Sequence, residues 1–357
     1  MTSEEILGIG PLSPPVTGPG VKNKYLRAGL EENGIKIDWI NTLEKRYQSF
    51  ARIIKKASNY DYFLLSVSSK GRFLISPVLC SMISITSSRG ILLPAGGEFA
   101  AELDQLPVGL SSIYKRCFSK FDAILPQTRQ LTLDLNRHFS ENDIIIERLP
   151  NLRPRPDKHP KPSDITNDKK EGLNLLYVGR IKKPKGISEM ISGVQSVNEE
   201  FSNITLDIFG HFLPGDLFEQ KFKKEVEGSE SVQFKGEIIN EEVINKMREY
   251  DMLLFPTYYP GEGFPGVIVE AFMAGIPVLA TDWNYNSELI DHGYNGLLCE
   301  PKSSKAIADS IRYILQNKCH LENMKRHSWG SSKKYSVQSV TEDLIEIFKR
   351  SGWQVVL

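Results

Sequence analysis

Two segments of the chain place charged residues beside glycines where a predicted helix begins. The first is Tyr177–Met190 (YVGRIKKPKGISEM), in which a predicted strand ends at Gly179, Arg180 follows directly and Lys185-Gly186 stands just before a helix. A guanidinium group binds anions bidentately, an ammonium group acts as a point charge, and a helix N-terminus adds partial positive charge. The segment predicts an anion site. A solvated basic loop is the alternative, because two further lysines lie in it.

The second segment, Tyr259–Val278 (YPGEGFPGVIVEAFMAGIPV), carries two carboxylates separated by seven residues. Its glycines and prolines keep Glu262 in a loop, whereas Glu270 falls on the first turns of the following helix. Carboxylate oxygens accept hydrogen bonds from the hydroxyls of a sugar or a ribose, and the loop's backbone N–H groups can hold an anion. Taken singly, Glu262 is better explained as a helix cap and Glu270 as a solvated helical residue.

The elements around these segments alternate between strands and helices. The predicted strands are Leu173–Val178, Ile204–Phe209, Ser231–Phe234, Met252–Phe255, Val278–Thr281 and Gly296–Cys299. Such alternation is typical of a parallel sheet covered on both faces, which binds ligands at the carboxyl ends of its strands. Both charged segments follow such an end, with a predicted helix over Ile187–Val197 between the first two strands.

The first half of the chain predicts a second unit of the same kind. Its predicted strands are Ile6–Ile9, Ile35–Ile40, Tyr60–Val67, Ile91–Pro94, Ala123–Pro126 and Ile144–Leu149, with a helix over Asn23–Asn33 that ends at Gly34. The proline-rich segment Pro150–Lys170 reads as a linker. We therefore expect an α/β chain of two Rossmann-like doubly wound domains facing a cleft, 1–162 and 163–335. A C-terminal helix, about 336–357, could pack back on the first domain.

Composition and charge exclude several classes of protein. The 357 residues, with 44 basic and 44 acidic side chains, exclude a disordered or coiled-coil chain. The four cysteines are far apart, which argues against a disulfide framework. The N-terminus does not resemble a signal peptide, and the longest apolar stretch, Phe73–Ile85, is too short to span a bilayer. A cytoplasmic location follows as an expectation.

Charge is unevenly distributed along the chain. Residues 1–162 carry 22 basic and 16 acidic side chains, a net +6, and residues 163–357 carry 22 and 28, a net −6. A basic first half could face anionic lipid or an anionic acceptor, although ordinary surface variation explains it at least as well. The basic helix Ser111–Phe121 allows peripheral contact with a membrane. A core-facing aromatic stripe with a solvated basic face is the favoured interpretation of that helix.

The two charged segments together resemble the retaining, nucleotide-sugar-dependent glycosyltransferases of family 4 (group 1), which have the two-domain GT-B fold. The matching pieces are Gly179-Arg180-x4-Lys185-Gly186, Glu262-Gly263-Phe264-Pro265 and Glu270-Ala271-Phe272-Met273-Ala274-Gly275-Ile276-Pro277-Val278. Further pieces in the same order are Gly236, Ala280-Thr281-Asp282, Glu288 and Asn295-Gly296-Leu297-Leu298. The resemblance covers nearly all of residues 172–315 and the first half only loosely.

The resemblance implies a role for each matching residue. Arg180 and Lys185 would bind the donor diphosphate and stabilise its developing charge, Glu262 would hold hydroxyls of the donor sugar, and Glu270 would hold the ribose. The catalytic residues would be Arg180, Lys185 and Glu262. The donor-binding residues would be Gly18, Gly20, Gly179, Arg180, Lys185, Glu262, Gly263, Phe264, Pro265, Gly266, Val267 and Glu270. The loop holding Gly18 and Gly20 would approach the donor from the first domain, unless it is only a flexible turn.

The acceptor side departs from the family pattern, which has a histidine in the middle of the first domain. Here that domain has only His138, in a late helix, and His159, in the linker. The corresponding place is Leu92–Phe99, where Gly97 could let an acceptor approach and Glu98 could orient its hydroxyl. A surface or capping role is the alternative for Glu98. No protein base is required if the leaving diphosphate takes the acceptor proton.

The resemblance predicts a hexosyltransferase that moves a sugar from a nucleoside diphosphate to an acceptor hydroxyl in polysaccharide or glycoconjugate assembly. The acceptor would be a carbohydrate or a lipid-linked glycan, and no nucleic acid is expected. No cofactor or metal is expected, since the chain has no Asp-x-Asp and no ligand-like histidine spacing. A dehydrogenase is disfavoured because the Gly18 loop lacks the dinucleotide fingerprint. The alternatives left open are a non-catalytic nucleotide- or partner-binding subunit, and a GT-B phosphorylase or epimerase. His211 is a candidate near the donor, with a structural role as its alternative.

Overall fold

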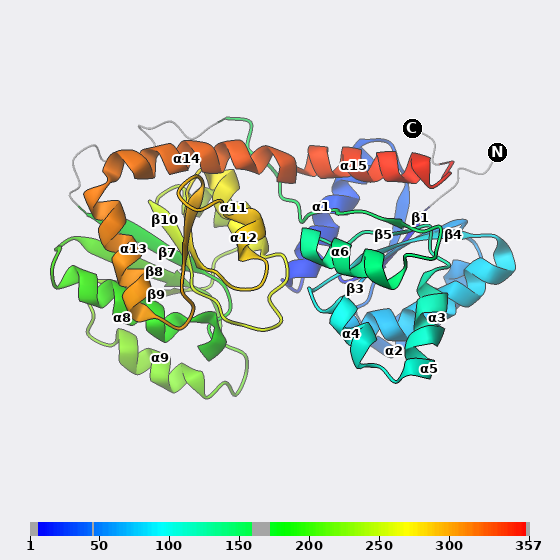
Figure 1. Ribbon diagram of the computed structural model, residues 1–357, viewed down its shortest axis with the longest axis horizontal. Helices are drawn as coiled ribbons and strands as arrows, with labels where there is room; N and C mark the ends of the chain where they lie inside the picture. The colour runs from blue at the N-terminus through cyan, green and yellow to red at the C-terminus, as the bar shows by residue number, and fades with distance from the viewer. Residues whose placement is uncertain (1–5, 45, 159–171, 355–357) are drawn as a thin grey trace. The chain divides into compact units, whose positions relative to one another are not determined.

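A computed structural model describes residues 6–44, 46–158 and 172–354. The chain divides into two compact α/β units (Figure 1). Unit 1 comprises residues 1–153 and 335–357, and unit 2 comprises residues 154–334. The predicted boundary at 162/163 lies outside the described residues. The structure instead divides the chain at 153/154 and again at 334/335, because the last helix belongs to unit 1.

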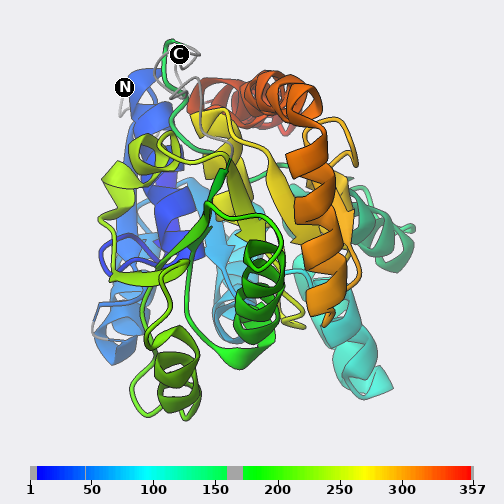
Figure 2. The ribbon, with the colours of Figure 1, turned by 90° about the vertical axis from the view of Figure 1, so that its left-hand side faces the viewer.

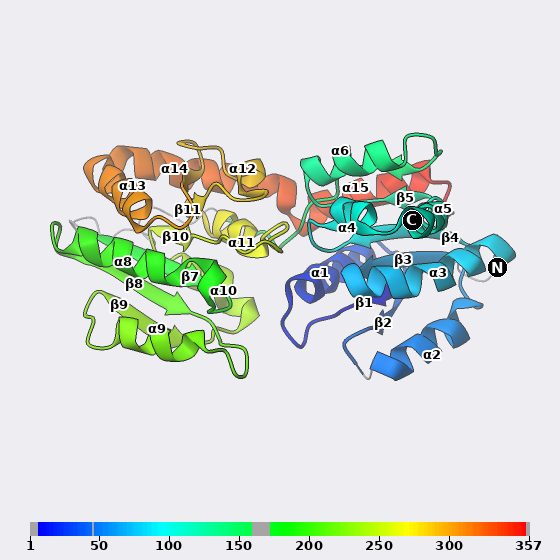
Figure 3. The same ribbon diagram turned by 60° about the horizontal axis from the view of Figure 1, so that its bottom comes forward.

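Unit 1 is built on a six-stranded parallel sheet with the order β2-β1-β3-β4-β5-β6 (Figure 3). Its strands are β1 (Ile6–Gly10), β2 (Ile37–Asn41), β3 (Tyr62–Val67), β4 (Arg89–Pro94), β5 (Ala123–Ile124) and β6 (Ile145–Ile146). Its helices are α1 (Gly18–Glu32), α2 (Arg46–Ala57), α3 (Ser69–Thr86), α4 (Phe99–Gln105), α5 (Val108–Phe118), α6 (Arg129–His138) and α15 (Val337–Arg350).

Both faces of the central strands β1 and β3 are buried, which explains why these strands are largely apolar. Along β3, Phe63 and Leu65 belong to a core formed with α2 to α6, whereas Tyr62 and Leu64 belong to a core formed with α1 and α15. Successive side chains of a strand point to opposite faces, so a strand between two helical layers needs apolar residues at every position.

Helix α15 packs on unit 1 beside α1. Gly29 permits this approach, since a Cβ atom there would lie 2.3 Å from Thr341 Oγ1. Beyond the helix, the Trp353 ring stacks on Phe348 at a centroid distance of 4.5 Å, and Trp353 Nε1 donates a hydrogen bond to Asp122 Oδ2 at 3.0 Å. These contacts bring the C-terminal segment back to the first unit.

Unit 2 repeats the architecture with a six-stranded parallel sheet of order β12-β11-β10-β7-β8-β9. Its strands are β7 (Leu173–Val178), β8 (Ile204–Phe209), β9 (Val232–Gly236), β10 (Met252–Phe255), β11 (Val278–Thr281) and β12 (Gly296–Cys299). Its α-helices are α8 (Ile187–Asn198), α9 (Phe218–Val226), α10 (Val243–Met247), α11 (Gly266–Ala274), α12 (Asn286–Leu289), α13 (Ser304–Gln316) and α14 (Lys318–Ser332). Short 3₁₀ turns lie at η1 (Lys183–Lys185), η2 (Asn240–Glu242) and η3 (Lys333–Tyr335).

Helices α8 and α13 lie side by side in unit 2 (Figure 2, green and orange). Their buried faces contribute Val194 and Ile311 to the same core as Leu175 and Tyr177 of β7. The predicted class of two Rossmann-like doubly wound units is confirmed. Among the residues that the structure describes, no helix is long and apolar enough to cross a membrane.

Helix α1 begins five residues earlier than predicted, at Gly18 instead of Asn23. Thr17 is its N-cap, and Thr17 Oγ1 accepts a hydrogen bond from the Gly20 N–H at 3.1 Å. Gly18 and Gly20 therefore lie in the first helical turn and not in a loop, which corrects the prediction. A threonine cap followed by an early proline favours a helix start, and this signal outweighed the glycines.

Candidate active site

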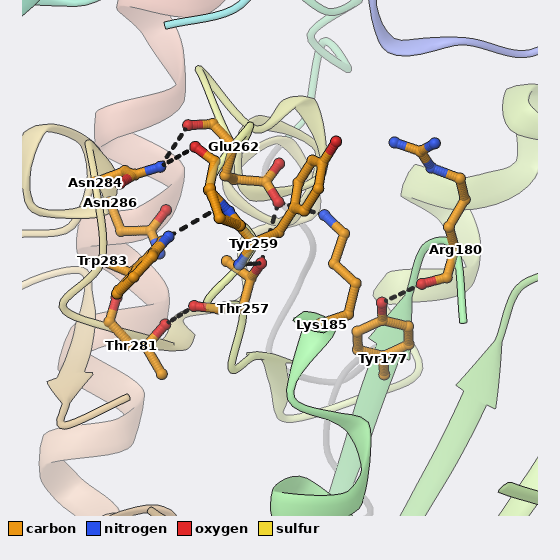
Figure 4. A network of polar contacts seen from close by, with 11 residues as sticks. Tyr177, Arg180, Lys185, Thr257, Tyr259, Glu262, Thr281, Trp283, Asn284 and Asn286 are labelled. Atoms are coloured by element: carbon orange, nitrogen blue, oxygen red, sulfur yellow. Dashed lines mark hydrogen bonds and ion pairs between the residues drawn. The ribbon is translucent and has the colours of Figure 1, made fainter. Parts of the chain in front are cut away.

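The carboxyl end of β7 positions Arg180. Gly179 N–H donates to the Phe209 carbonyl at 3.0 Å and Ile181 N–H to the His211 carbonyl at 2.9 Å, so the ladder with β8 continues past the strand. The buried Tyr177 hydroxyl donates to the Arg180 carbonyl at 2.9 Å. The Arg180 backbone is thus fixed, while its side chain is exposed and its guanidinium points away from Tyr177 (Figure 4).

Lys185 ends the turn η1, and Gly186 is the N-cap residue of α8. Gly186 has φ +72°, and a Cβ atom there would lie 2.1 Å from the Pro256 carbonyl oxygen. Only glycine allows both this left-handed conformation and this close approach. The turn therefore packs directly on the segment that follows β10, which brings Lys185 to Glu262.

Lys185 and Glu262 form an ion pair between the two charged segments. Lys185 Nζ contacts Glu262 Oε2, and the two side chains are 9% and 14% exposed. Thr257 Oγ1 donates to the same carboxylate oxygen at 3.2 Å (Figure 4). The structure thus brings together two residues that lie 77 positions apart in the chain.

The end of β11 and the residues that follow it hold the backbone of the Glu262 loop. Asn284 Nδ2 donates to the Glu262 carbonyl at 3.0 Å, and Trp283 Nε1 donates to the Tyr259 carbonyl at 3.0 Å. Thr281 Oγ1 donates to the Thr257 carbonyl. Sequence analysis assigned no role in the site to these supporting residues: Thr257, Tyr259, Thr281, Trp283 and Asn284. Their position at or just after the ends of β10 and β11, at the carboxyl edge of the sheet, is the signal that could have found them.

Positive charge dominates this edge. Lys182 Nζ lies 3.5 Å from the Tyr259 ring centroid, a cation–π contact. The pKa of Lys182 lies below its usual value because of partial burial and because Arg180 and Lys185 repel its charge. Glu262 contacts Lys185, and both Glu262 and Asp216 attract the charge of Lys182. An arrangement of this kind is suited to a ligand with more than one negative charge.

Helix α11 begins beside Glu262. Pro265 is its N-cap residue and makes no side-chain capping hydrogen bond, which leaves the first N–H groups, of Gly266 and Val267, to the surroundings of the helix N-terminus. Phe264 is buried before it, and Glu270 is 7% exposed within the helix. The predicted donor residues Gly263 to Glu270 thus lie on one loop and one helix in the same unit as Arg180 and Lys185.

The predicted acceptor-side residues lie in unit 1, just past the carboxyl end of β4. Glu98 is exposed and occupies the N-cap position of α4 without a side-chain capping bond; Gly97 precedes it. The neighbouring Arg72 was not predicted: it is 1% exposed, its guanidinium lies 4.0 Å from the Phe99 ring centroid, and its Nη2 lies 3.2 Å from Glu102 Oε2. Burial lowers the pKa of Arg72 to about 10, against the opposing charges of Glu102 and Glu98.

Of the histidines named from the sequence, His211 lies beside the backbone of Arg180, since its carbonyl accepts a hydrogen bond from the Ile181 N–H. His211 Nδ1 lies 3.8 Å from Glu237 Oε2 just beyond β8, and His138 Nε2 lies 3.4 Å from Asp104 Oδ1. His159 lies outside the described residues. Within the described ranges, no group of three or more histidine, cysteine, aspartate or glutamate side chains could hold a metal ion.

Gly18 offers a test of the first unit's part in donor binding. A Cβ atom at Gly18 would meet nothing within 4 Å, so Gly18→Ala is expected to leave the melting temperature unchanged or slightly raised. If the donor approaches this turn closely, the added methyl group should raise the donor KM several-fold. Gly109→Ala, at an equally open glycine in the first turn of α5, is the control. Equal donor KM values for Gly18→Ala and Gly109→Ala would show that Gly18 does not contact the donor.

A match to a known protein family falls in unit 2. The family model described as glycosyl transferases group 1 matches residues 160–333. The chain is 28% identical over 180 residues to a phosphatidyl-myo-inositol mannosyltransferase of Mycobacterium leprae, covering 50% of this chain and 46% of that protein. It is 28% identical over 144 residues to a glycogen synthase of Mycobacterium tuberculosis, covering 40% and 34%. The chain thus spans less than half the length of each of these relatives.

Solved structures resemble the chain over nearly its whole length. The crystal structure of HepE from Anabaena in complex with UDP superposes with a TM-score of 0.74 at 16% identity, covering 97% of this chain and all of that one. At this identity the likeness concerns the fold. Residues 160–333 therefore resemble the glycosyl transferases group 1 family, and the chain has the GT-B fold of two Rossmann-like domains.

Proposed function

We propose that the protein is a retaining, metal-independent hexosyltransferase that moves a sugar from a nucleoside diphosphate to an acceptor hydroxyl in polysaccharide or glycoconjugate assembly in the cytoplasm. The observation that carries this proposal is the contact of Lys185 with Glu262 beside Arg180, at the carboxyl edge of unit 2. The names of the relatives, a mannosyltransferase and a glycogen synthase, support hexose transfer. UDP and UDP-glucose in the HepE structures make a uridine diphosphate sugar the first donor to test.

Binding of the donor would break the ion pair between Lys185 and Glu262, and each of these two side chains would contact the donor instead. Lys185 and Arg180 bind the diphosphate, and Glu262 accepts hydrogen bonds from the sugar hydroxyls. As the bond from the anomeric carbon to the phosphate oxygen breaks, negative charge grows on the leaving group, and these two cations stabilise it most at that stage. The N-terminus of α11 adds N–H donors and partial positive charge, and Glu270 holds the ribose.

The acceptor step needs no base from the protein. The acceptor oxygen bonds to the anomeric carbon on the face that the diphosphate leaves, and its proton passes to the departing phosphate oxygen. In unit 1, Glu98 orients the acceptor hydroxyl and Gly97 permits its close approach. Arg72 acts as a positioning residue through its charge on Glu98 and its ion pair with Glu102.

The first test replaces the exposed cation of the site. Arg180→Ala is expected to lower the rate of transfer by about 10²-fold with little change in melting temperature, because its side chain is exposed and acts on the transition state. A panel of nucleotide sugars and an acceptor extract are assayed in the presence of a chelator, since the mechanism assigns no metal. Lys183→Ala, exposed in the neighbouring turn, is the control. Undiminished transfer by Arg180→Ala, or loss of activity in chelator, would contradict the assignment.

Helices α3 and α5 of unit 1 support a second part of the proposal, peripheral contact with an anionic membrane. A groove of about 630 Å³ lies between them, lined by Ile85, Ile113, Arg116 and Lys120 among others. Ile85 and Ile113 are 81% and 66% exposed. Neither helix contains an acidic residue, so the face combines aliphatic side chains with cations, which suits an anionic bilayer. The aromatic side of α5 faces the core, with Phe118 buried.

Membrane contact predicts selective binding to anionic vesicles. Ile85→Glu combined with Ile113→Glu is expected to lower binding to phosphatidylglycerol vesicles at least about tenfold, because each change replaces an inserted aliphatic side chain by a charge. Leu133→Glu, on α6 and 55% exposed, is the control. Vesicle flotation measures binding. Binding of the double variant equal to that of the wild type would contradict the proposal. If the wild type is a dimer and the double variant is not, a second copy of the chain covers this face, and the proposal is contradicted as well.

A further inference from the structure

Two of the four cysteines meet between helices α3 and α5. Cys80 Sγ lies 2.6 Å from Cys117 Sγ, and Cys80 Sγ also lies 2.9 Å from the Cys117 carbonyl oxygen. This sulfur–sulfur separation is only about half an ångström longer than a disulfide bond of about 2.05 Å. The two thiols thus stand close to bonding distance, although they lie 37 positions apart in the chain.

The packing around the pair keeps the two helices in this register. The Phe73 ring of α3 meets Tyr114 and Phe118 of α5 edge to face, at centroid distances of 4.8 and 6.0 Å. The Tyr114 hydroxyl donates to the Phe73 carbonyl at 3.1 Å. Because these contacts belong to the core of unit 1, the cysteines meet without any rearrangement of the chain.

Cys80 and Cys117 differ in their exposure to solvent, so their sulfurs react in different steps. Cys80 is 6% exposed, and its pKa is raised by its hydrogen bond with Cys117 and by burial. The Cys80 thiol therefore gives up its proton less readily than a free cysteine. Cys117 is more exposed, and both residues line the groove between α3 and α5, together with the cations Arg116 and Lys120. A small reagent therefore reaches Cys117 before it reaches Cys80.

We propose that Cys80 and Cys117 form a reversible disulfide that ties α3 to α5. The oxidant is a low-molecular-weight disulfide such as oxidised glutathione. Cys117 loses its proton, and its sulfur attacks one sulfur of the oxidant and displaces one thiol, which leaves a mixed disulfide on Cys117. Cys80 loses its proton and attacks Cys117 Sγ, displacing the second thiol. The protein loses two hydrogens and two electrons, and the oxidant becomes two thiols.

The other two cysteines provide internal controls. Cys299 is half-buried on β12, and burial together with the charge of Glu300 raises its pKa to about 12. Cys319 is exposed. Among the described residues, neither makes a sulfur–sulfur contact. Exposure alone would direct oxidation to Cys319, whereas proximity directs it to the Cys80 and Cys117 pair.

The test uses the full chain with Cys299→Ser and Cys319→Ser, equilibrated with oxidised and reduced glutathione in varied ratio, then alkylated. We expect a loss of two hydrogens by intact mass, one cross-linked peptide pair joining Cys80 to Cys117, and a melting temperature raised by roughly 5–10 °C, because a long loop is closed. Dithiothreitol should reverse all three changes. Adding Cys117→Ser should abolish the cross-link.

Peptide mapping of the wild type repeats the test without substitutions. Stable glutathionylation of Cys117 without a cross-link would overturn the proposal, because it would show that Cys80 cannot complete the exchange. Alkylation of both cysteines at every glutathione ratio would overturn it as well. A cross-linked pair that involves Cys319 instead would show that exposure, and not the α3 to α5 contact, decides which thiols are oxidised.

Discussion

Replacing Lys185 by methionine is expected to lower kcat/KM for sugar transfer by about 10²–10³-fold. The side chain is 9% exposed, so its charge acts through little screening solvent on whatever lies beside Glu262. Methionine keeps most of the length of lysine and removes only the charge. A loss in kcat as well as in kcat/KM would indicate that Lys185 acts on the leaving group in the transition state.

The ion pair with Glu262 requires a control for stability. Lys185→Met leaves Glu262, 14% exposed, without its cation and with only the Thr257 hydroxyl on the same oxygen. This destabilises unit 2 on its own. The double variant Lys185→Met with Glu262→Gln removes both charges, and we expect it to recover most of the melting temperature but none of the activity. Recovery of wild-type activity would show that the pair is only structural.

Lys183→Met is the matched control for charge. Lys183 lies two residues from Lys185 in the same turn η1, but its side chain is exposed. We expect its kcat/KM to stay within about twofold of the wild type, since exposed charges are screened by water. A loss as large as that of Lys185→Met would mean that the net charge of the turn matters, and not the position of Lys185. Initial rates at several donor concentrations provide the comparison.

The sequence predicted unit 2 better than unit 1 for a physical reason. Strands such as β7 and β11 are short apolar runs bounded by glycine or polar residues, and their predicted bounds match the structure. Arg180, Lys185 and Glu262 could be singled out as candidates because charge beside glycine at a strand end is unusual in a core. Thr257 and Asn284 were missed, since a threonine or asparagine is common in loops and its role depends on which backbone it meets.

The errors in unit 1 have a different origin. The glycines and prolines before Val21 indicated a loop, but Thr17 caps the helix and Pro19 lies in its first turn, where proline is tolerated. Arg72 was overlooked because its burial follows from α3 packing against α4, which no local pattern shows. The contact of Cys80 with Cys117 is equally invisible in the sequence, where the two residues are separated by a strand and a helix.

Replacing Lys22 is also expected to have a large effect, in this case on the free energy of unfolding and on its pH dependence. It lies in α1 and is 2% exposed, and burial together with the charge of Arg153 lowers its pKa to about 7. In the unfolded chain a lysine titrates near 10.4. Between these two values the unfolded state binds a proton that the folded state lacks, so the free energy of unfolding rises with pH. Below about pH 7 both states are charged, and the full cost of burying the charge is present.

Lys22→Met should therefore stabilise unit 1 most at low pH. We expect a gain in the free energy of unfolding on the order of 3 kcal/mol at or below about pH 7, falling towards zero as the pH approaches about 10. Urea unfolding of variant and wild type at several pH values gives the difference, in which the other titrating groups cancel. Lys36→Met, at an exposed lysine of the same unit, should change stability by less than about 0.5 kcal/mol at every pH. A pH-independent gain for Lys22→Met would mean that hydrophobic packing, and not the buried charge, accounts for it.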